Sequence, residues 1–126
     1  MKYAATVVRG TGRGKTLGFP TLNLELPAAL ARQRGIFAGW IWLGARKHPV
    51  AFHLGPAPVF KRRQVTLEAF VIDKKITRPP ARVSFELVKR LRPVKNFASP
   101  AALAAQMRGD VAAAKSVLGM VGKTGR

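Results

Sequence analysis

Gly10-Thr-Gly-Arg-Gly-Lys-Thr-Leu-Gly-Phe-Pro-Thr-Leu-Asn-Leu24 is the stretch of sequence around which the rest of the chain can be organised. Its first half alternates glycines with Arg13, Lys15 and Thr16. Because glycine has no Cβ, such a loop can bring backbone N–H groups close to an anion, and the two cations add charge that favours a phosphate. The spacing is not that of a Walker A loop, and glycine-rich turns also join ordinary strands. The loop alone therefore leaves two interpretations open, a phosphate cradle and a plain turn.

The segment directly after the loop places a hydroxyl and an amide two residues apart, at Thr21 and Asn23. If this segment is extended, both oxygens point to the same face. Mg²⁺ takes oxygen ligands and commonly completes its shell with water and substrate phosphates. The pair, beside a phosphate-binding loop, is consistent with a magnesium site.

Length and composition indicate one folded domain, residues 1–126, of which 48% are hydrophobic. The sequence has no apolar run of transmembrane length, and no signal-peptide core precedes the first strand-like segment. No cysteine occurs, which excludes disulfides and thiolate chemistry. We therefore expect a cytoplasmic protein without a membrane segment.

The charge is unusual, since 23 Lys and Arg face only 5 Asp and Glu, a formal net charge of +18. This favours either a nucleic-acid partner or a basic enzyme surface for phosphorylated substrates. The cations are scattered over turns and strand ends, for example at 61–63, 74–75 and 89–90, and form no single recognition stripe. We expect nucleic acid to bind weakly, without sequence preference, and to be displaced by salt.

Short segments with β-branched and aromatic residues, separated by Gly and Pro, predict a small closed barrel. The expected strands are 3–9, 19–24, 35–43, 50–54, 65–72 and 82–90. Ser99-Pro100 predicts a helix start, followed by an alanine-rich helix over 101–118. We expect an interruption at Gly109-Asp110, where Asp110 can cap a second helical segment.

Residues 12–24 resemble the opening signature of the riboflavin kinases, which include the kinase domain of bacterial bifunctional FAD synthetases and a free-standing eukaryotic enzyme. The similarity covers roughly residues 3–118. It continues at Gly35-Ile-Phe37, His53–Phe60, Leu67-Glu68, Leu91-Arg92 and Phe97-Ala-Ser99. One segment differs: 73–81 is basic and proline-bearing, where the family carries an acidic turn ending in Tyr-Gly.

This resemblance implies a six-stranded antiparallel Greek-key (split) barrel over about 3–92 and a C-terminal helical segment over about 99–118. It also implies transfer of the ATP γ-phosphate to the ribityl 5′-hydroxyl of riboflavin, giving FMN, with Mg²⁺. The chain would be a stand-alone kinase domain and a monomer, without the nucleotidyl-transferase domain. A competing hypothesis is a catalytically weakened barrel that serves as a basic RNA- or ribosome-binding module.

Site residues follow from the same resemblance, position by position. The predicted roles are phosphate binding for Gly10, Gly12, Gly14 and Lys15, Mg²⁺ binding for Thr21 and Asn23, general base for Glu68, and flavin binding for Arg92 and Phe97. Periodicity alone would make Glu68 a solvent-facing strand residue. The plain structural alternatives are barrel–helix packing for Phe97 and a surface cation for Arg92. We assign no role to His48 or His53, since a lone histidine in a strand or turn is more often structural, and we expect no zinc site.

Overall fold

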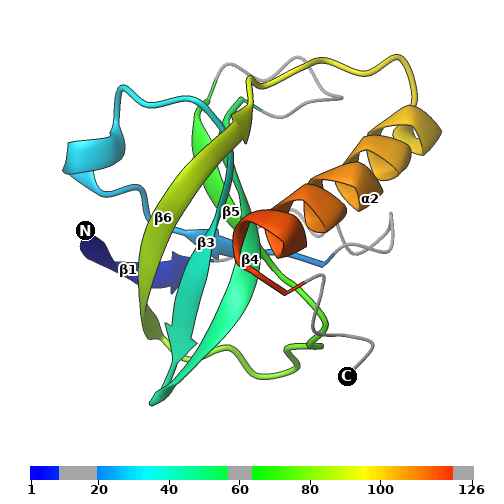
Figure 1. Ribbon diagram of the computed structural model, residues 1–126. Coiled ribbons are helices and arrows are strands. Elements are labelled where there is room, and N and C mark those ends of the chain that lie inside the picture. The colour runs from blue at the N-terminus through cyan, green and yellow to red at the C-terminus, as the bar shows by residue number, and fades with distance from the viewer. Residues whose placement is uncertain (9–19, 57–63, 121–126) are drawn as a thin grey trace.

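A computed structural model describes residues 1–8, 20–56 and 64–120 and shows a closed antiparallel barrel with one long helix against its side (Figure 1). Around the barrel the strands follow the order β1-β2-β5-β4-β3-β6. Strands β3, β4 and β5 are consecutive neighbours and β6 returns beside β3, which is a Greek-key connection. The predicted fold class is therefore confirmed. The elements are β1 (Lys2–Val8), β2 (Leu22–Leu24), the 3₁₀ turn η1 (Ala28–Leu30), β3 (Gly35–Leu43), β4 (Arg46–Gly55), β5 (Thr66–Val71), β6 (Arg82–Arg92) and α2 (Pro100–Val117).

The barrel interior is filled by alternate residues of the strands, as the period of two requires. Phe52 and Phe85 are fully buried at its centre, with ring centroids 5.4 Å apart. In β5 the inward residues are Leu67, Ala69 and Val71, all buried. The intervening residues of β5, Glu68 among them, therefore point to the outer face of the barrel.

Helix α2 covers part of that outer face, where it packs against β3, β4 and β6 (Figure 1). Its buried Ala114 joins a second apolar cluster with Ala38 and Ile72, outside the barrel core. The helix begins as predicted: the Ser99 hydroxyl oxygen accepts a hydrogen bond from the Ala102 N–H at 3.1 Å, and Pro100 occupies the first turn. Within the described residues, no helix has the length and apolar character needed to cross a membrane.

Two sequence-based expectations were wrong. The helix is not interrupted at Gly109, and Asp110 is a buried residue in mid-helix rather than a cap. Strand β4 begins at Arg46 instead of position 50, because Gly44 takes a positive φ of 70° that lets the hairpin reverse within two residues.

Two glycines with opposite surroundings give a first prediction. A Cβ at Gly39 would collide with the backbone carbonyl of Glu86 and lie 2.9 Å from the Phe52 ring, whereas Gly109 has only one atom nearby, Gln106 Nε2 at 3.7 Å. Gly39→Ala should lower the free energy of unfolding by about 1–3 kcal/mol or more. Gly109→Ala should raise it by up to about 1 kcal/mol, because alanine is the better helix former. Urea unfolding of both variants measures the two changes, and a Gly39→Ala variant as stable as the parent would contradict this packing.

Candidate active site

One row of residues crosses five strands on the outer face of the barrel. Glu68 on β5 lies directly opposite Asn23 on β2 and, on its other side, opposite His53 on β4. His53 lies opposite Ile36 on β3, which in turn lies opposite Arg92 on β6. Strand pairing thus brings three of the predicted site residues, from three distant segments, into one row that also contains His53.

The carboxylate of Glu68 is half-buried and held by hydroxyl groups. Thr21 Oγ1 donates to Glu68 Oε1 at 2.9 Å, and Thr66 Oγ1 donates to Oε2 at 3.3 Å. The second contact is long for an O–H···O bond, so Oε2 is the less firmly held oxygen. Thr21, Asn23 and Glu68 therefore gather at one place, and one carboxylate oxygen there remains available to a further donor.

The oxygens at this place suit a hard divalent cation. No group of three or more His, Cys, Asp or Glu within the described part of the chain is arranged to hold a metal. Mg²⁺ needs no such group, since it commonly keeps several waters and takes one or two protein oxygens with substrate phosphates. A hydroxyl that donates to Glu68, as Thr21 does, keeps its oxygen lone pairs free for a cation. The residues present therefore fit Mg²⁺.

The guanidinium of Arg92 is engaged by helix α2. Its Nε and Nη2 donate to Asp110 Oδ1 and Oδ2, both at 2.7 Å, and the two side chains are only 15% and 8% exposed. Gln106 Nε2 also donates to Asp110 Oδ1, at 3.1 Å. The ring of Phe97 lies 5.9 Å from the Arg92 guanidinium carbon. Arg92 and Phe97 are thus close together, and Arg92 joins the last strand to the helix; flavin binding by this pair stays a prediction.

Four predicted phosphate-binding residues, Gly10, Gly12, Gly14 and Lys15, lie outside the described residues.

His53 is a polar residue without a visible partner. Both ring nitrogens are buried, and neither has a hydrogen bond among the described residues. Burial lowers the pKa of His53 below its usual value of 6.5, with a smaller contribution from Arg92, while Glu68 and Asp110 oppose the shift. The ring is therefore neutral near pH 7, with one N–H donor and one acceptor nitrogen.

The lowered pKa of His53 gives a pH prediction for stability. Between about pH 6.5 and 5 the unfolded chain takes up more proton at this residue than the folded chain does, because the folded pKa is lowered. The free energy of unfolding should therefore fall as the pH falls, by at most about 1.4 kcal/mol per pH unit. Ordinary carboxyl groups titrate mainly below this window. Urea unfolding at both pH values should show a smaller loss for His53→Leu than for the parent. Burial and Lys74 also lower the pKa of His48, so a His48→Gln variant is needed as a control. Equal losses of unfolding free energy in the parent and in His53→Leu would contradict the prediction.

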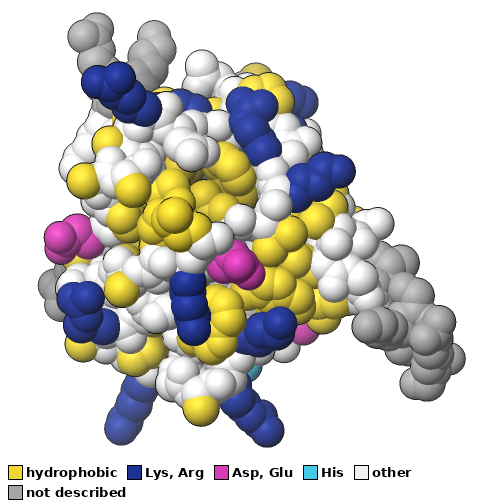
Figure 2. Space-filling view, turned by 60° about the vertical axis from the view of Figure 1, so that its left-hand side comes forward, with side chains coloured by type: hydrophobic (Ala, Val, Ile, Leu, Met, Phe, Trp, Pro, Cys, Tyr) yellow, Lys and Arg dark blue, Asp and Glu magenta, His cyan; other side chains and the backbone are white. Residues whose placement is uncertain are grey.

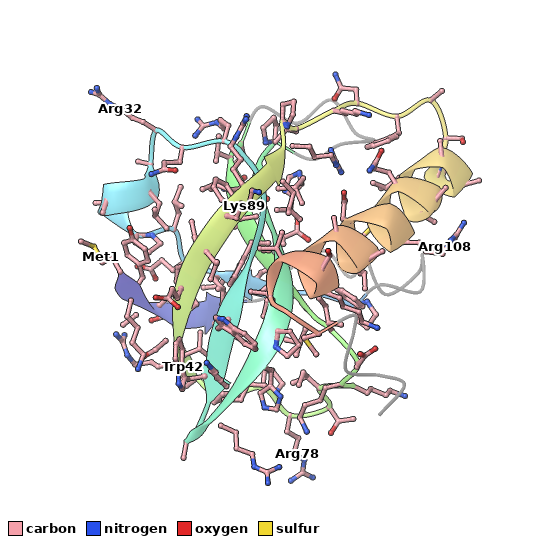
Figure 3. All side chains as sticks on the ribbon, in the orientation of Figure 1. Met1, Arg32, Trp42, Arg78, Lys89 and Arg108 are labelled. Carbon is pink, nitrogen blue, oxygen red and sulfur yellow. The ribbon has the colours of Figure 1, made fainter. Side chains whose placement is uncertain are left out.

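The positive charge is spread over the molecule. Figure 2 shows Lys and Arg side chains dispersed over one face, with apolar surface between them. Arg32, Arg78 and Arg108 project outward from well separated edges (Figure 3). This dispersion agrees with the expectation of no single stripe, as far as the described residues extend.

Two residues of this site were not predicted from the sequence, Asp110 beside the row and His53 within it. Asp110 gives no local signal, since a helical aspartate next to glycine is equally typical of a cap, and its ion pair with Arg92 joins residues 18 positions apart. His53 did offer a signal, because it opens one of the segments that resemble the riboflavin kinases. Its position opposite Glu68 emerges only from strand pairing.

Comparisons with known proteins agree in their result. A profile of the Flavokinase family, described as riboflavin kinase, matches residues 1–118. Riboflavin kinase of Mus musculus is 35% identical over 121 residues, covering 89% of this chain and 77% of the mouse protein. The bifunctional riboflavin kinase/FMN adenylyltransferase of Escherichia coli (strain K12) is 29% identical over 115 residues, covering 90% of this chain and 37% of that protein. The crystal structure of riboflavin kinase from Trypanosoma brucei matches with a TM-score of 0.66 at 21% identity, covers 95% of this chain and 80% of its own, and shows the same fold.

Proposed function

Because the chain belongs to the riboflavin kinase family, we propose that it transfers the γ-phosphate of ATP to the ribityl 5′-hydroxyl of riboflavin and releases FMN and ADP. The family membership indicated by the sequence is confirmed. The observation that carries the proposal is the meeting of Glu68 with Thr21 and Asn23 on the outer face of the barrel.

Glu68 acts as the general base in this proposal. Its carboxylate accepts the proton of the 5′-hydroxyl as the hydroxyl oxygen forms a bond to the γ-phosphorus and the bond to the ADP oxygen breaks. Thr21 fixes Oε1 through its hydrogen bond, which leaves Oε2 for the substrate hydroxyl. A carboxylate held on one oxygen is already oriented before the substrate arrives, which lowers the entropy cost of reaching the reactive geometry.

Thr21 and Asn23 supply the neutral oxygens that would hold Mg²⁺. Held there, the ion would supply positive charge that offsets the charge developing on the phosphates. We further propose that Gly10, Gly12, Gly14 and Lys15 cradle the phosphates. Strand β2 follows that loop directly in the sequence, so it would place the phosphates beside Glu68.

The test is formation of FMN by purified protein with riboflavin, ATP and Mg²⁺, separated from riboflavin by chromatography. We expect turnover that stops when EDTA removes the divalent cation and resumes when excess Mg²⁺ is added. Protein that retains its fold by circular dichroism but forms no FMN would refute the proposal.

A further inference from the structure

The row across the barrel holds one polar group to which the reaction gives no role. His53 lies between Glu68, the proposed base, and Ile36 and Arg92 on the far side. Neither of its ring nitrogens finds a hydrogen bond among the described residues. A buried donor or acceptor without a partner is costly, so its presence in a folded protein calls for an explanation.

Its surroundings suggest a ligand group rather than a protein partner. Glu68 accepts from Thr21 and Thr66. Asp110, which also influences His53 electrostatically, accepts from Arg92 and Gln106. Neither acidic group is hydrogen-bonded to His53, which is left with one donor and one acceptor.

A hydroxyl group matches this combination, because it donates once and accepts through two lone pairs. The proposed substrate carries several hydroxyls on its ribityl chain next to the one that reacts. Neighbouring strands are about 4.8 Å apart, so a group bound at His53 is roughly one strand spacing from a group bound at Glu68. That separation spans about four bonds of an extended chain, as between a terminal hydroxyl oxygen and the hydroxyl oxygen two carbons further along.

We propose that His53 is a substrate-binding residue that hydrogen-bonds a hydroxyl of the ribityl chain and thereby selects a polyhydroxylated acceptor. This inference rests on the proposed function and adds a specificity determinant to it. In this arrangement the chain of the acceptor passes His53 and its terminal hydroxyl meets Glu68. His53 as a whole is partly exposed although its ring nitrogens are buried, so the ring must turn before a nitrogen reaches the ligand.

The experiment compares the parent with His53→Leu, which removes both nitrogens, and with His53→Asn, which keeps one donor and one acceptor. Binding of riboflavin is measured by flavin fluorescence. Binding of lumiflavin, which has a methyl group in place of the ribityl chain, is measured in the same way for comparison. We expect His53→Leu to bind riboflavin about tenfold or more weakly, lumiflavin binding to be unchanged, and His53→Asn to recover most of the riboflavin affinity. In turnover, KM for riboflavin should rise while kcat and KM for ATP stay at the parent values.

Misfolding is not expected to explain these losses, because His53→Leu removes unpaired buried polar atoms and should resist urea at least as well as the parent. If His53→Leu is less stable than the parent, riboflavin binding by His53→Asn and the comparison with lumiflavin decide whether His53 binds the ribityl chain. Unchanged riboflavin binding in His53→Leu would overturn the inference. So would equal losses for riboflavin and lumiflavin, which indicate packing, or a fall in kcat alone, which indicates action through Glu68. If the parent protein binds riboflavin but forms no FMN, the proposed function is refuted, and the binding comparison still tests the role of His53. If the parent protein binds no riboflavin, both the proposed function and this inference are refuted.

Discussion

Replacing Glu68 with glutamine is expected to lower kcat for FMN formation about 10²–10⁴-fold, the usual contribution of a positioned general base. Glutamine has nearly the same shape, and its amide oxygen can still accept the hydrogen bond that Thr21 donates to Oε1 at 2.9 Å. The variant should therefore fold and bind both substrates, because only the ability to accept the hydroxyl proton is lost. Steady-state kinetics with riboflavin and ATP measures the change, and KM should move much less than kcat.

Glu86→Gln is the matched control for this experiment. Glu86 also lies on a barrel strand, but its side chain is 37% exposed and its ion-pair partner is the N-terminal amine at 3.8 Å. Neutralising it removes the same charge from the same kind of element and should leave kcat unchanged. Full turnover in Glu68→Gln, or an equal loss in Glu86→Gln, would remove Glu68 from the role of base.

Replacing Asp110 with alanine is expected to lower the free energy of unfolding by about 3–5 kcal/mol. The bidentate pair with Arg92 is almost fully buried, so the substitution leaves a guanidinium with little access to water and no counter-charge. A loss of this size is a large share of the 5–15 kcal/mol typical of a folded protein. Chemical denaturation of the two proteins measures it directly.

Asp73→Asn provides the comparison, because Asp73 also pairs with a cation of α2. Its carboxylate lies 3.1 Å from Lys115 Nζ, yet the Asp73 side chain is 62% exposed. Asparagine tolerates the positive φ of 59° found at this position, and an exposed pair is worth at most about 1 kcal/mol. Similar losses for the two variants would mean that the Arg92–Asp110 pair is not buried in solution.

The sequence predicted best where local pattern and tertiary packing agree. Richness in aromatic and β-branched residues placed β3 at Gly35–Leu43, with the same bounds as the structure. Ser99 with Pro100 correctly marked the start of α2. Among the predicted site residues, Thr21, Asn23 and Glu68 prove to be neighbours. Their roles stay predictions, since proximity alone does not establish chemistry.

What the sequence did not predict depends on contacts between distant segments. Gly109 weakens a helix locally, yet α2 continues through it because Leu103, Asp110 and Ala114 on either side are buried against the barrel. The partners of Asp110 and the neighbours of His53 follow from strand order, which a single sequence does not reveal. Periodicity did place Glu68 on the outer face, but not the hydroxyl groups that surround it there.

The row that joins Asn23, Glu68, His53 and Arg92 also determines where the chain can tolerate insertions. These residues meet because each strand keeps its hydrogen-bonding alignment with the next one. A single residue added within β5 ahead of Glu68 would turn that carboxylate toward the apolar interior, and a closed barrel has no free edge to absorb the shift. The hairpin turn at Gly44 carries none of these side chains. Lengthening of the chain during evolution, or by design, should therefore be accepted at such turns and excluded from the middle of the strands.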